Sequence, residues 1–235
     1  MTSQITFPVN TLVGNLTIEL PQYIEVVALP DRQICEAFKS FAKFTCEGEK
    51  NSLYRGQNTQ TSKLTVKIKG KRNKIIIGSN ADVRGTINIV GGNLTVLIGA
   101  STTFNNVNIY CKGWNHSVFI GKDCMFSSDI EIRTSDSHSV IDLERMETTN
   151  PPDGVFIGDH VWISKFAFIQ RGSVLASDTI VGFGTMINGN FSTENKLIVG
   201  RPGREVPNRR VSWARKGELK VVDDSIYQWR ELPLL

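Results

Sequence analysis

The stretch IGDHVWISKFAFIQRGSVLASDTIVGFGTMINGNF, residues 157 to 191, repeats a hydrophobic pattern every six positions. An aliphatic residue opens each unit, at Ile157, Ile163, Ile169, Leu175, Val181 and Ile187. Four positions later stand mostly small or β-branched residues, at Val161, Ala167, Ser173, Thr179, Thr185 and Phe191. A period of six fits neither a helix nor an alternating strand, because it repeats one short strand plus one turn. Three units close a triangular coil, so the stretch predicts an all-β parallel β-helix with the aliphatic residues inside.

The repeat is looser upstream, where Ile-Gly pairs mark successive coils at Ile77, Ile98, Ile120 and Ile157. The first two spacings are 21 and 22 residues instead of 18, and KGKRN, VGGNL and KGWNH recur just before the first three pairs. These segments supply turn residues, so a few residues are expected to bulge from each coil. We expect coils from about Leu64 to Val199, where the phase of six still holds.

The regions outside the repeat suggest caps, which a solenoid needs at its ends. Residues 1–63 are expected to form an N-terminal cap region, with a helix in PDRQICEAFKSFAKF because Ile34, Phe38 and Phe41 have helical spacing. The β-helix domain is expected over residues 64–206 and a tail over 207–235. DDSIYQWRELPLL predicts a short helical turn followed by an extended end, with Trp229 as a packing residue.

The composition is that of an ordinary soluble protein with a net charge of +4. No stretch is long and apolar enough to cross a bilayer, and the first residues lack a basic start, so a cytoplasmic location is expected. Seven basic residues stand against two acidic ones between Arg201 and Lys220. They indicate either a solvated tail or a contact with phosphate. No nucleic acid partner is expected.

The repeat stops at a histidine. Counting by sixes from Ile120 gives Phe126, Ile132 and then His138, after which sixteen residues rich in charge, Thr and Pro precede the next regular unit. A β-helix tolerates such an excursion because a loop projects without disturbing the stack, and such loops often carry function. We expect the loop over residues 139–156, with His138 at its root.

An ordered set of elements resembles the left-handed β-helix acyltransferases of the hexapeptide superfamily, especially bacterial polysaccharide and sugar O-acetyltransferases. The set is TSDSHSVID, the excursion, VFIGDHVWIS, the hexads and VGRPGREV, and it spans roughly residues 64 to 206. The resemblance implies that His138 is the catalytic base and that Trp162 lines the site. The chain departs from the family at Gly203 and Arg204, where Ala and Lys are usual, and at Ser164, where Gly is common.

The resemblance also implies acetyl-CoA as co-substrate and a homotrimer with its sites between subunits. The coenzyme would lie along the later coils, and Arg in place of Lys keeps a cation for its phosphates. Its candidate contacts, given as a neighbourhood, are Trp162, Ser164, Lys165, Gly182, Phe183, Thr185, Arg201 and Arg204.

Histidine suits the removal of a proton from an attacking hydroxyl near neutral pH. In an extended strand, Asp136 would face the same way as His138 and orient its imidazole or bond the acceptor, although a turn-forming Asp fits equally. Direct transfer is favoured over a covalent route, because Cys124 falls at a small inward position. His116, His138 and His160 occupy different phases of the repeat, so no metal site is expected, and His116 and His160 are expected at exposed turns.

The leading hypothesis is an acetyl-CoA-dependent O-acetyltransferase that modifies a sugar hydroxyl of a bacterial capsule or O-antigen. One alternative is N-acetylation of a nucleotide-linked amino sugar. The other is a non-catalytic β-helix scaffold, which would need neither a histidine at a loop root nor the V-W-I element.

Overall fold

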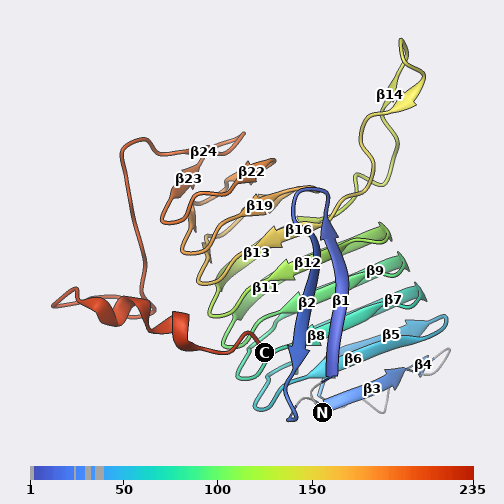
Figure 1. Cartoon of the computed structure of the whole chain (residues 1–235), viewed down its shortest axis with the longest axis horizontal. Coiled ribbons are helices and arrows are strands. Elements are labelled where there is room, and N and C mark those ends of the chain that lie inside the picture. The colour runs from blue at the N-terminus through green and yellow to red at the C-terminus, as the bar shows by residue number, and fades with distance from the viewer. Residues whose placement is uncertain (1–2, 24, 30–32, 35–39) are drawn as a thin grey trace.

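The computed structural model describes residues 3–23, 25–29, 33–34 and 40–235, and its centre is a parallel β-solenoid of about seven turns (Figure 1). Strands one turn apart pair in parallel, so that Ile77, Ile98, Ile120 and Ile157 stand in one register. The prediction of an all-β, left-handed parallel β-helix is confirmed.

Each coil has three sides. The first face carries a column formed by Asp82, Thr103, Met125, Trp162 and Ile180. Its strands in the later coils are β17 (Trp162–Ile163), β20 (Ile180–Val181) and β23 (Leu197–Val199). The second face comprises β5 (Lys43–Glu47), β7 (Leu64–Lys71), β9 (Gly85–Gly92), β11 (Thr103–Trp114), β13 (Met125–Arg133), β18 (Phe168–Ile169) and β21 (Met186–Ile187), of which β11 and β13 begin on the first face. The third face comprises β6 (Asn51–Arg55), β8 (Lys74–Ile77), β10 (Thr95–Ile98), β12 (Ser117–Ile120), β16 (Val155–Ile157), β19 (Val174–Leu175) and β22 (Asn190–Phe191).

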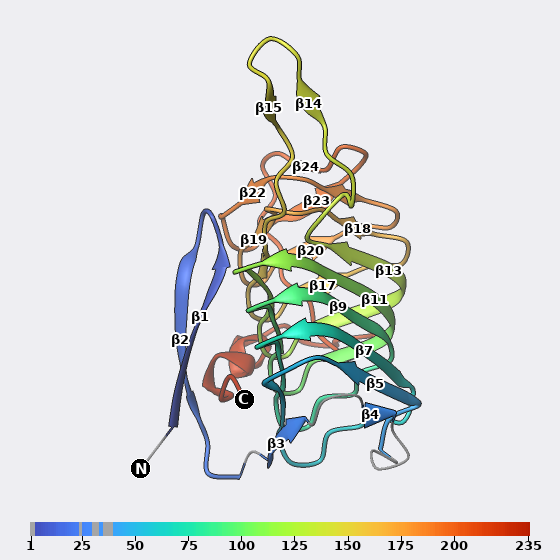
Figure 2. The ribbon, with the colours of Figure 1, turned by 90° about the vertical axis from the view of Figure 1, so that its right-hand side faces the viewer.

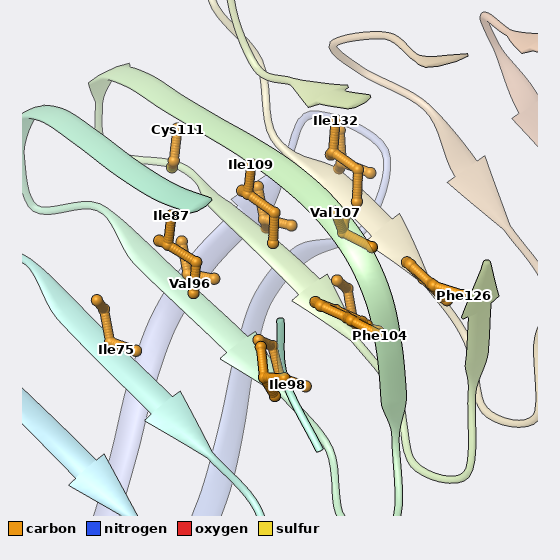
Figure 3. Packing of buried hydrophobic residues seen from close by; sticks show 14 of the residues in the cluster. Ile75, Ile87, Val96, Ile98, Phe104, Val107, Ile109, Cys111, Phe126 and Ile132 are labelled. Atoms are coloured by element: carbon orange, nitrogen blue, oxygen red, sulfur yellow. The ribbon is translucent and has the colours of Figure 1, made fainter. Parts of the chain in front are cut away.

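The core fills the inside of the solenoid with stacked aliphatic and aromatic side chains (Figure 3). All six aliphatic residues that open the hexads of residues 157–191 are fully buried in it. The small residues four positions later are also buried, except Phe191, which is partly buried against the core. Each of these inward-facing residues packs closely against the coils above and below, which explains why the six-residue period persists.

The phase of six does not reach Val199. Ile198 pairs with Val181 and is fully buried, whereas Val199 is 41% exposed. The last coil is therefore one residue shorter than the others in the regular stretch, and the expected register at Val199 is wrong. An extra aliphatic residue beside it made the sequence ambiguous at this point.

The longer early coils do not bulge as expected. Their additional residues lengthen the second-face strands, so that β7 and β9 have eight residues each while β18 and β21 have two. The segments KGKRN, VGGNL and KGWNH thus run from the end of a long strand into the next turn. The second face is accordingly broad in the early coils.

The solenoid begins one coil earlier than residue 64, because β5 and β6 already pair in parallel with β7 and β8. Two antiparallel strands cover this end: β3 (Glu25–Leu29) pairs with β6, and β4 (Gln33–Ile34) pairs with β5. The helix expected from PDRQICEAFKSFAKF is not seen where the structure describes that segment, since residues 33–34 are in β4 and residues 43–44 are in β5. Its remaining positions 30–32 and 35–39 lie outside the described residues.

An antiparallel hairpin of β1 (Ser3–Asn10) and β2 (Gly14–Leu20) lies across the third face (Figures 1 and 2). Its buried residues, including Phe7 and Ile18, pack on outward-facing Ile76, Leu97 and Phe119. The third face is therefore covered on both sides, and its strands read as continuous apolar runs.

The C-terminal tail leaves the last coil through β24 (Arg204–Glu205), which pairs antiparallel with β23. It returns along the solenoid to the 3₁₀ helix η1 (Asp224–Glu231) and ends with Leu235 buried beside the hairpin. The predicted short helical turn and extended end are confirmed. Within the described part of the chain, no helix combines the length and hydrophobicity that spanning a membrane requires.

Candidate functional site

The excursion that follows His138 is a projecting hairpin of β14 (Ile141–Asp142) and β15 (Glu147–Thr148) (Figure 2). It leaves the solenoid at the corner between the second and third faces, where β13 ends and β16 begins. Leu143 and Met146 near its tip are 81% and 76% exposed. The loop predicted over residues 139–156 is present, and its last residues, Val155 and Phe156, already belong to β16.

Asn150 fastens the two ends of this loop together. Its Nδ2 donates to Asp136 Oδ2 and to the His138 carbonyl, each at 2.9 Å, and its Oδ1 accepts from the Val140 amide at 2.6 Å. Arg171 from the next coil donates from Nε to Asp136 Oδ2 at 2.9 Å. The hydrogen bonds from Asn150 and Arg171 lower the pKa of Asp136. The loop root is thus held to the rigid solenoid by a charged pair and a buried amide.

His138 stands exposed at this fixed root. Ser137 before it has φ of 68°, a left-handed conformation that interrupts the extended backbone. Asp136 and His138 are consequently not neighbours on one strand face, and Asp136 bonds Asn150 and Arg171. Asp136 thus anchors the backbone on which His138 sits, and its effect on the imidazole or on the acceptor stays a prediction.

The other two histidines are buried, contrary to the expectation of exposed turns. His116 is covered at the loop base, with its Nε2 3.0 Å from Thr134 Oγ1, and burial lowers its pKa. His160 does occupy a turn, with φ of 52°, but the C-terminal tail covers it. Its Nδ1 lies 2.9 Å from Asp178 Oδ1. Among the residues described, no three His, Cys, Asp or Glu side chains form a group that could hold a metal ion.

Trp162 lies on the first face, paired with Met125 and Ile180. In a triangular coil this face is opposite the corner from which the His138 loop projects. Trp162 is partly exposed and borders a hollow of about 620 Å³ between the first face and the tail. It also borders a second hollow, of about 420 Å³, that extends along the first face toward Asp82 and Arg84. One chain therefore does not bring His138 and Trp162 into a common pocket.

The tail forms the outer wall of the larger hollow, and Trp213 and Arg215 are two of the residues that hold it there. Trp213 donates from Nε1 to the His160 carbonyl at 2.8 Å, and its ring stacks on the His160 ring with centroids 4.3 Å apart. Arg215 donates to Asp123 Oδ1 at 2.9 Å, to Thr103 Oγ1 at 3.0 Å and to two backbone carbonyls. A single segment distant in sequence thus shapes the surroundings of Trp162.

The expected coenzyme contacts gather at the corner between the first and second faces, because the register aligns Ile163, Val181 and Ile198 just before it. Lys165 forms an ion pair with Asp129 at 3.3 Å and lies 4.6 Å from the centroid of the Phe166 ring. Phe183 is 71% exposed and contacts Phe166 edge to face. Further members of this corner are Ser164, Gly182 and Arg201, whose guanidinium donates to the Gly184 carbonyl.

Besides Trp162 on the first face, two expected contacts are placed differently from the rest. Thr185 is fully buried inside the corner, so it supports the turn from within and offers no surface to a ligand. Arg204 lies in β24, beyond the corner, and donates to the Gly203 carbonyl at 3.0 Å. The corner therefore presents one lysine, one arginine and two aromatic rings to solvent.

The cysteines support the expectation of inert thiols. Cys124 is fully buried, donates from Sγ to the Gly158 carbonyl at 3.2 Å, and has a pKa raised by burial. Burial also raises the pKa of Cys111 to about 12. Neither thiol is placed to act as a nucleophile.

Sequence reasoning missed Asn150, Arg171, Trp213 and Arg215. Asn150 precedes Pro151 and Pro152, a turn signal that marks the return of the loop. Arg171 stands beside Gly172 in a hexad turn, which no pattern separates from other exposed basic residues. Trp213 and Arg215 act through contacts with coils about 50 to 110 residues away, so the local sequence gives no signal for them.

Comparison with known proteins gives two curated relatives, each called polysialic acid O-acetyltransferase. The chain is 32% identical over 132 residues to the one from Neisseria meningitidis, covering 55% of this chain and 60% of the relative. It is 27% identical over 152 residues to the one from Escherichia coli O1:K1 / APEC, covering 63% of this chain and 47% of the relative. The matches thus span about half to three fifths of the relatives' length. No family model matches the chain.

Two solved structures share the fold. The polySia-specific acetyltransferase NeuO superposes with a TM-score of 0.69 at 24% identity, over 80% of this chain and 78% of NeuO. The polysialic acid O-acetyltransferase OatWY superposes with a TM-score of 0.58 at 23% identity, over 77% of this chain and 98% of OatWY. The chain therefore has the β-helix fold of these acetyltransferases and, as its motifs indicated, resembles polysaccharide O-acetyltransferases in sequence.

Proposed function

We propose that this protein is an O-acetyltransferase that moves the acetyl group of acetyl-CoA to a hydroxyl of an anionic bacterial surface polysaccharide, with His138 as general base. The observation that carries the proposal is the placement of the imidazoles. Of the three histidines in the chain, all within the described residues, only His138 is exposed. It stands at a loop root fixed to the coils, and the two relatives named for this reaction support the reading.

The chemistry requires His138 to take up one proton and to release it again. A neutral alcohol is a poor nucleophile, so the imidazole removes the hydroxyl proton while the sugar oxygen forms its bond to the thioester carbonyl carbon. The carbon–sulfur bond then breaks, and the protonated imidazole returns its proton to the departing thiolate. Direct transfer of this kind needs no protein nucleophile, in agreement with the buried Cys124.

The corner between the first and second faces fits an acyl-CoA. Phe166 and Phe183 offer exposed apolar surface to the pantetheine arm, and Lys165 and Arg201 offer cations to the phosphates. This corner and Trp162 are separated by a full face from the corner that carries His138. We therefore propose that the site is completed between chains, with the His138 corner of one copy facing the first face of the next. A closed ring of three copies satisfies this arrangement.

The test is thiol release from acetyl-CoA with polysialic acid and other bacterial glycans as acceptors. His138→Asn is expected to lower kcat by roughly 10²- to 10⁴-fold, the usual contribution of a general base. Glu144→Gln, on the same exposed loop, serves as the control and should retain turnover. Full activity of the His138 variant would refute the assignment of the base, and failure of every acceptor would favour the scaffold alternative.

The assembly is tested separately by mixing two inactive variants. His138→Asn and Trp162→Ala copies, each weakly active alone, should regain activity when they are unfolded and refolded together, because mixed rings contain sites with both native residues. Sedimentation equilibrium gives the oligomeric state in the same samples. A monomer with full activity, or no recovery in mixed rings, would contradict a site shared between chains.

A further inference from the structure

The broad part of the second face carries a row of outward-facing lysines that the fold does not require. Lys67, Lys69 and Lys71 stand at alternate positions of β7 and are exposed, with Ile68 buried between the first two, and Lys112 is exposed on β11. Lysines often protect the edge of a sheet from aggregation. At Lys67 and Lys69, β7 has β5 on one side and β9 on the other, so these lysines are not on an edge, whereas Lys112 lies just beyond the last residue of β11 that pairs with β13, Tyr110. Protection of an edge therefore does not explain Lys67 and Lys69.

These cations are only weakly neutralised. Lys69 lies 4.0 Å from Glu47, and both side chains are largely exposed, which makes the pair weak. Within the described residues, neither Lys67 nor Lys112 forms an ion pair. The register places Lys67 in one column with Tyr110 and with Arg133, which is paired with Glu131, and it places Lys69 in one column with Glu47 and Lys112. Strands stack about 4.8 Å apart, so within these columns a basic residue recurs along the solenoid axis after two or three coils.

An exposed tryptophan adjoins this row. Trp114 is 56% exposed and shares a column with Gly92 and Lys71. A Cβ at Gly92 would lie only 2.3 Å from Cζ3 of Trp114, so the indole rests on the bare backbone of β9 because residue 92 has no side chain. Lys71 Nζ lies 5.8 Å from the centroid of the ring. The ring is thus held flat, with its free side toward solvent.

Two hollows meet at Trp114 and link the row to the loop root. One, of about 430 Å³, extends over β7 and β9 past Lys69 and Lys71. The other, of about 710 Å³, reaches from Trp114 to Asn15, Pro152 and Arg171. Arg171 is the residue that bonds Asp136, two positions before His138. The two hollows therefore form a continuous surface from Lys69 through Trp114 to Arg171, the residue that anchors the His138 root.

From these contacts we infer that the second face binds a polymeric anionic glycan along the solenoid axis and leads it to His138. The carboxylates of successive sugar units would meet Lys67, Lys69 and Lys112, and one sugar ring would lie on Trp114. A flat ring and regularly spaced charges suit an extended chain of acidic sugars. This inference rests on the proposed function for its acceptor class and adds the path of the chain over the protein.

Binding is measured without acetyl-CoA, by fluorescence anisotropy with labelled polysialic acid in long chains and as the trisaccharide. The intact protein should bind long chains about tenfold or more tightly than the trisaccharide, and this affinity should fall as salt rises from about 50 to about 200 mM. Lys67→Gln/Lys112→Gln should weaken long-chain binding about fivefold to tenfold. Arg209→Gln/Lys220→Gln removes the same charge from exposed positions in the tail and should change it less than about twofold.

The role of the Trp114 ring is tested by Trp114→Ala, which removes the indole, and by Gly92→Ala, which keeps the indole but displaces it from the backbone of β9. Both should weaken long-chain binding, and Gly217→Ala, where an added Cβ meets nothing within 4 Å, is the control. Circular dichroism confirms that each variant is folded. Equal affinity for long and short chains in the intact protein, or equal losses in test and control variants, would overturn the inference.

Acetyl transfer separates this inference from the proposed function. Length-dependent binding that the face variants abolish, without acetyl transfer to any glycan, would support the binding surface and refute the activity. Transfer to the trisaccharide and long chains at the same rate, unaffected by Lys67→Gln/Lys112→Gln, would support the activity and refute the surface.

Discussion

Arg171 Nε donates to Asp136 Oδ2 at 2.9 Å, and this bond ties the root of the excursion to a coil that follows it by 35 residues. Arg171 also donates from Nη1 to the Pro151 carbonyl on the returning strand of the loop, at 3.4 Å. The side chain therefore spans both ends of the loop that carries His138. The rigidity of the solenoid is passed to the loop mainly through this residue and Asn150.

Arg171→Gln is expected to misplace His138 without removing it. Because small displacements of a catalytic group are costly, kcat for acetyl transfer should fall about tenfold to a hundredfold. Arg171→Lys keeps the charge but not the planar fork, so it should recover part of the loss. Steady-state kinetics measures both variants, and an unchanged kcat in Arg171→Gln would mean that the loop root holds its position without this pair.

Acidification should loosen the same loop. The hydrogen bonds from Asn150 and Arg171 lower the pKa of Asp136 below its ordinary value of 3.8. A lowered folded-state pKa stabilises the fold above the ordinary value, and this contribution is lost as the pH falls through the folded pKa. Hydrogen exchange of residues 139–150 should therefore be slow relative to Asp136→Asn at pH 5, and the difference should vanish at strongly acidic pH. If the difference in exchange rate between the two proteins grew on acidification, the stabilising role of ionised Asp136 would be refuted.

Cys124→Ala is expected to leave acetyl transfer nearly intact. The thiol is buried in the core with a raised pKa, so it contributes packing and weak hydrogen bonds with the Gly158 and Lys122 carbonyls and the Val161 amide. The change should cost about 1–2 kcal/mol of unfolding free energy, measured by urea titration, and reduce kcat less than about twofold. Loss of all turnover in a folded variant would indicate a covalent route through this cysteine.

The register of the last coil makes a paired prediction. Ile198 is fully buried and Val199 is 41% exposed. Ile198→Ala should lower the free energy of unfolding by about 2–4 kcal/mol, whereas Val199→Ala should change it by about 0.5 kcal/mol or less. Urea unfolding followed by circular dichroism compares the two. Equal losses of unfolding free energy, or a larger loss in Val199→Ala, would mean that Val199 and not Ile198 occupies the buried position of the repeat.

The tail should detach when its stacked contacts are removed. Trp213 is 6% exposed, stacks on His160 and donates to the His160 carbonyl. Trp213→Ala should weaken the attachment by about 3 kcal/mol, and Trp213→Phe, which keeps a ring but loses the hydrogen bond, by about 1 kcal/mol. Limited proteolysis in residues 215–223 reports the detachment. Val221→Ala, at a position that is 72% exposed, is the control and should be cut no faster than the unaltered chain.

The sequence predicted the parts of the fold that repeat. A buried position recurring every six residues constrains every coil in the same way, so Ile157 to Ile187 identify the solenoid without any knowledge of long-range contacts. The Ile-Gly pairs also aligned correctly although their spacing varies. The register failed only where two candidates, Ile198 and Val199, stood side by side. The difference of one residue was decided by the length of the preceding turn.

The parts that do not repeat were less predictable. The hairpin of β1 and β2 is held by its packing on Ile76, Leu97 and Phe119, and the sequence does not distinguish these three from residues inside the solenoid. Two of the three histidines are buried by segments remote in sequence, so their exposure was misjudged. The loop root was located correctly from the break at His138, but its anchors depended on Arg171 and Asn150 meeting across the loop. Contacts of this kind are properties of the assembled coils.

The antiparallel strands at the two ends of the solenoid determine whether the chain can grow into fibres. A stack of parallel coils exposes unpaired backbone at its first and last strands, and any similar coil would extend it. Here β3 and β4 occupy that backbone at one end and β24 occupies part of it at the other, each running against the direction of the coils. At the last coil β21 and β22 keep one unpaired side, but the first coil of a second copy is covered by β3 and β4, so the copies cannot continue one another's coils head to tail. The copies are left to associate side by side, where their faces and corners meet.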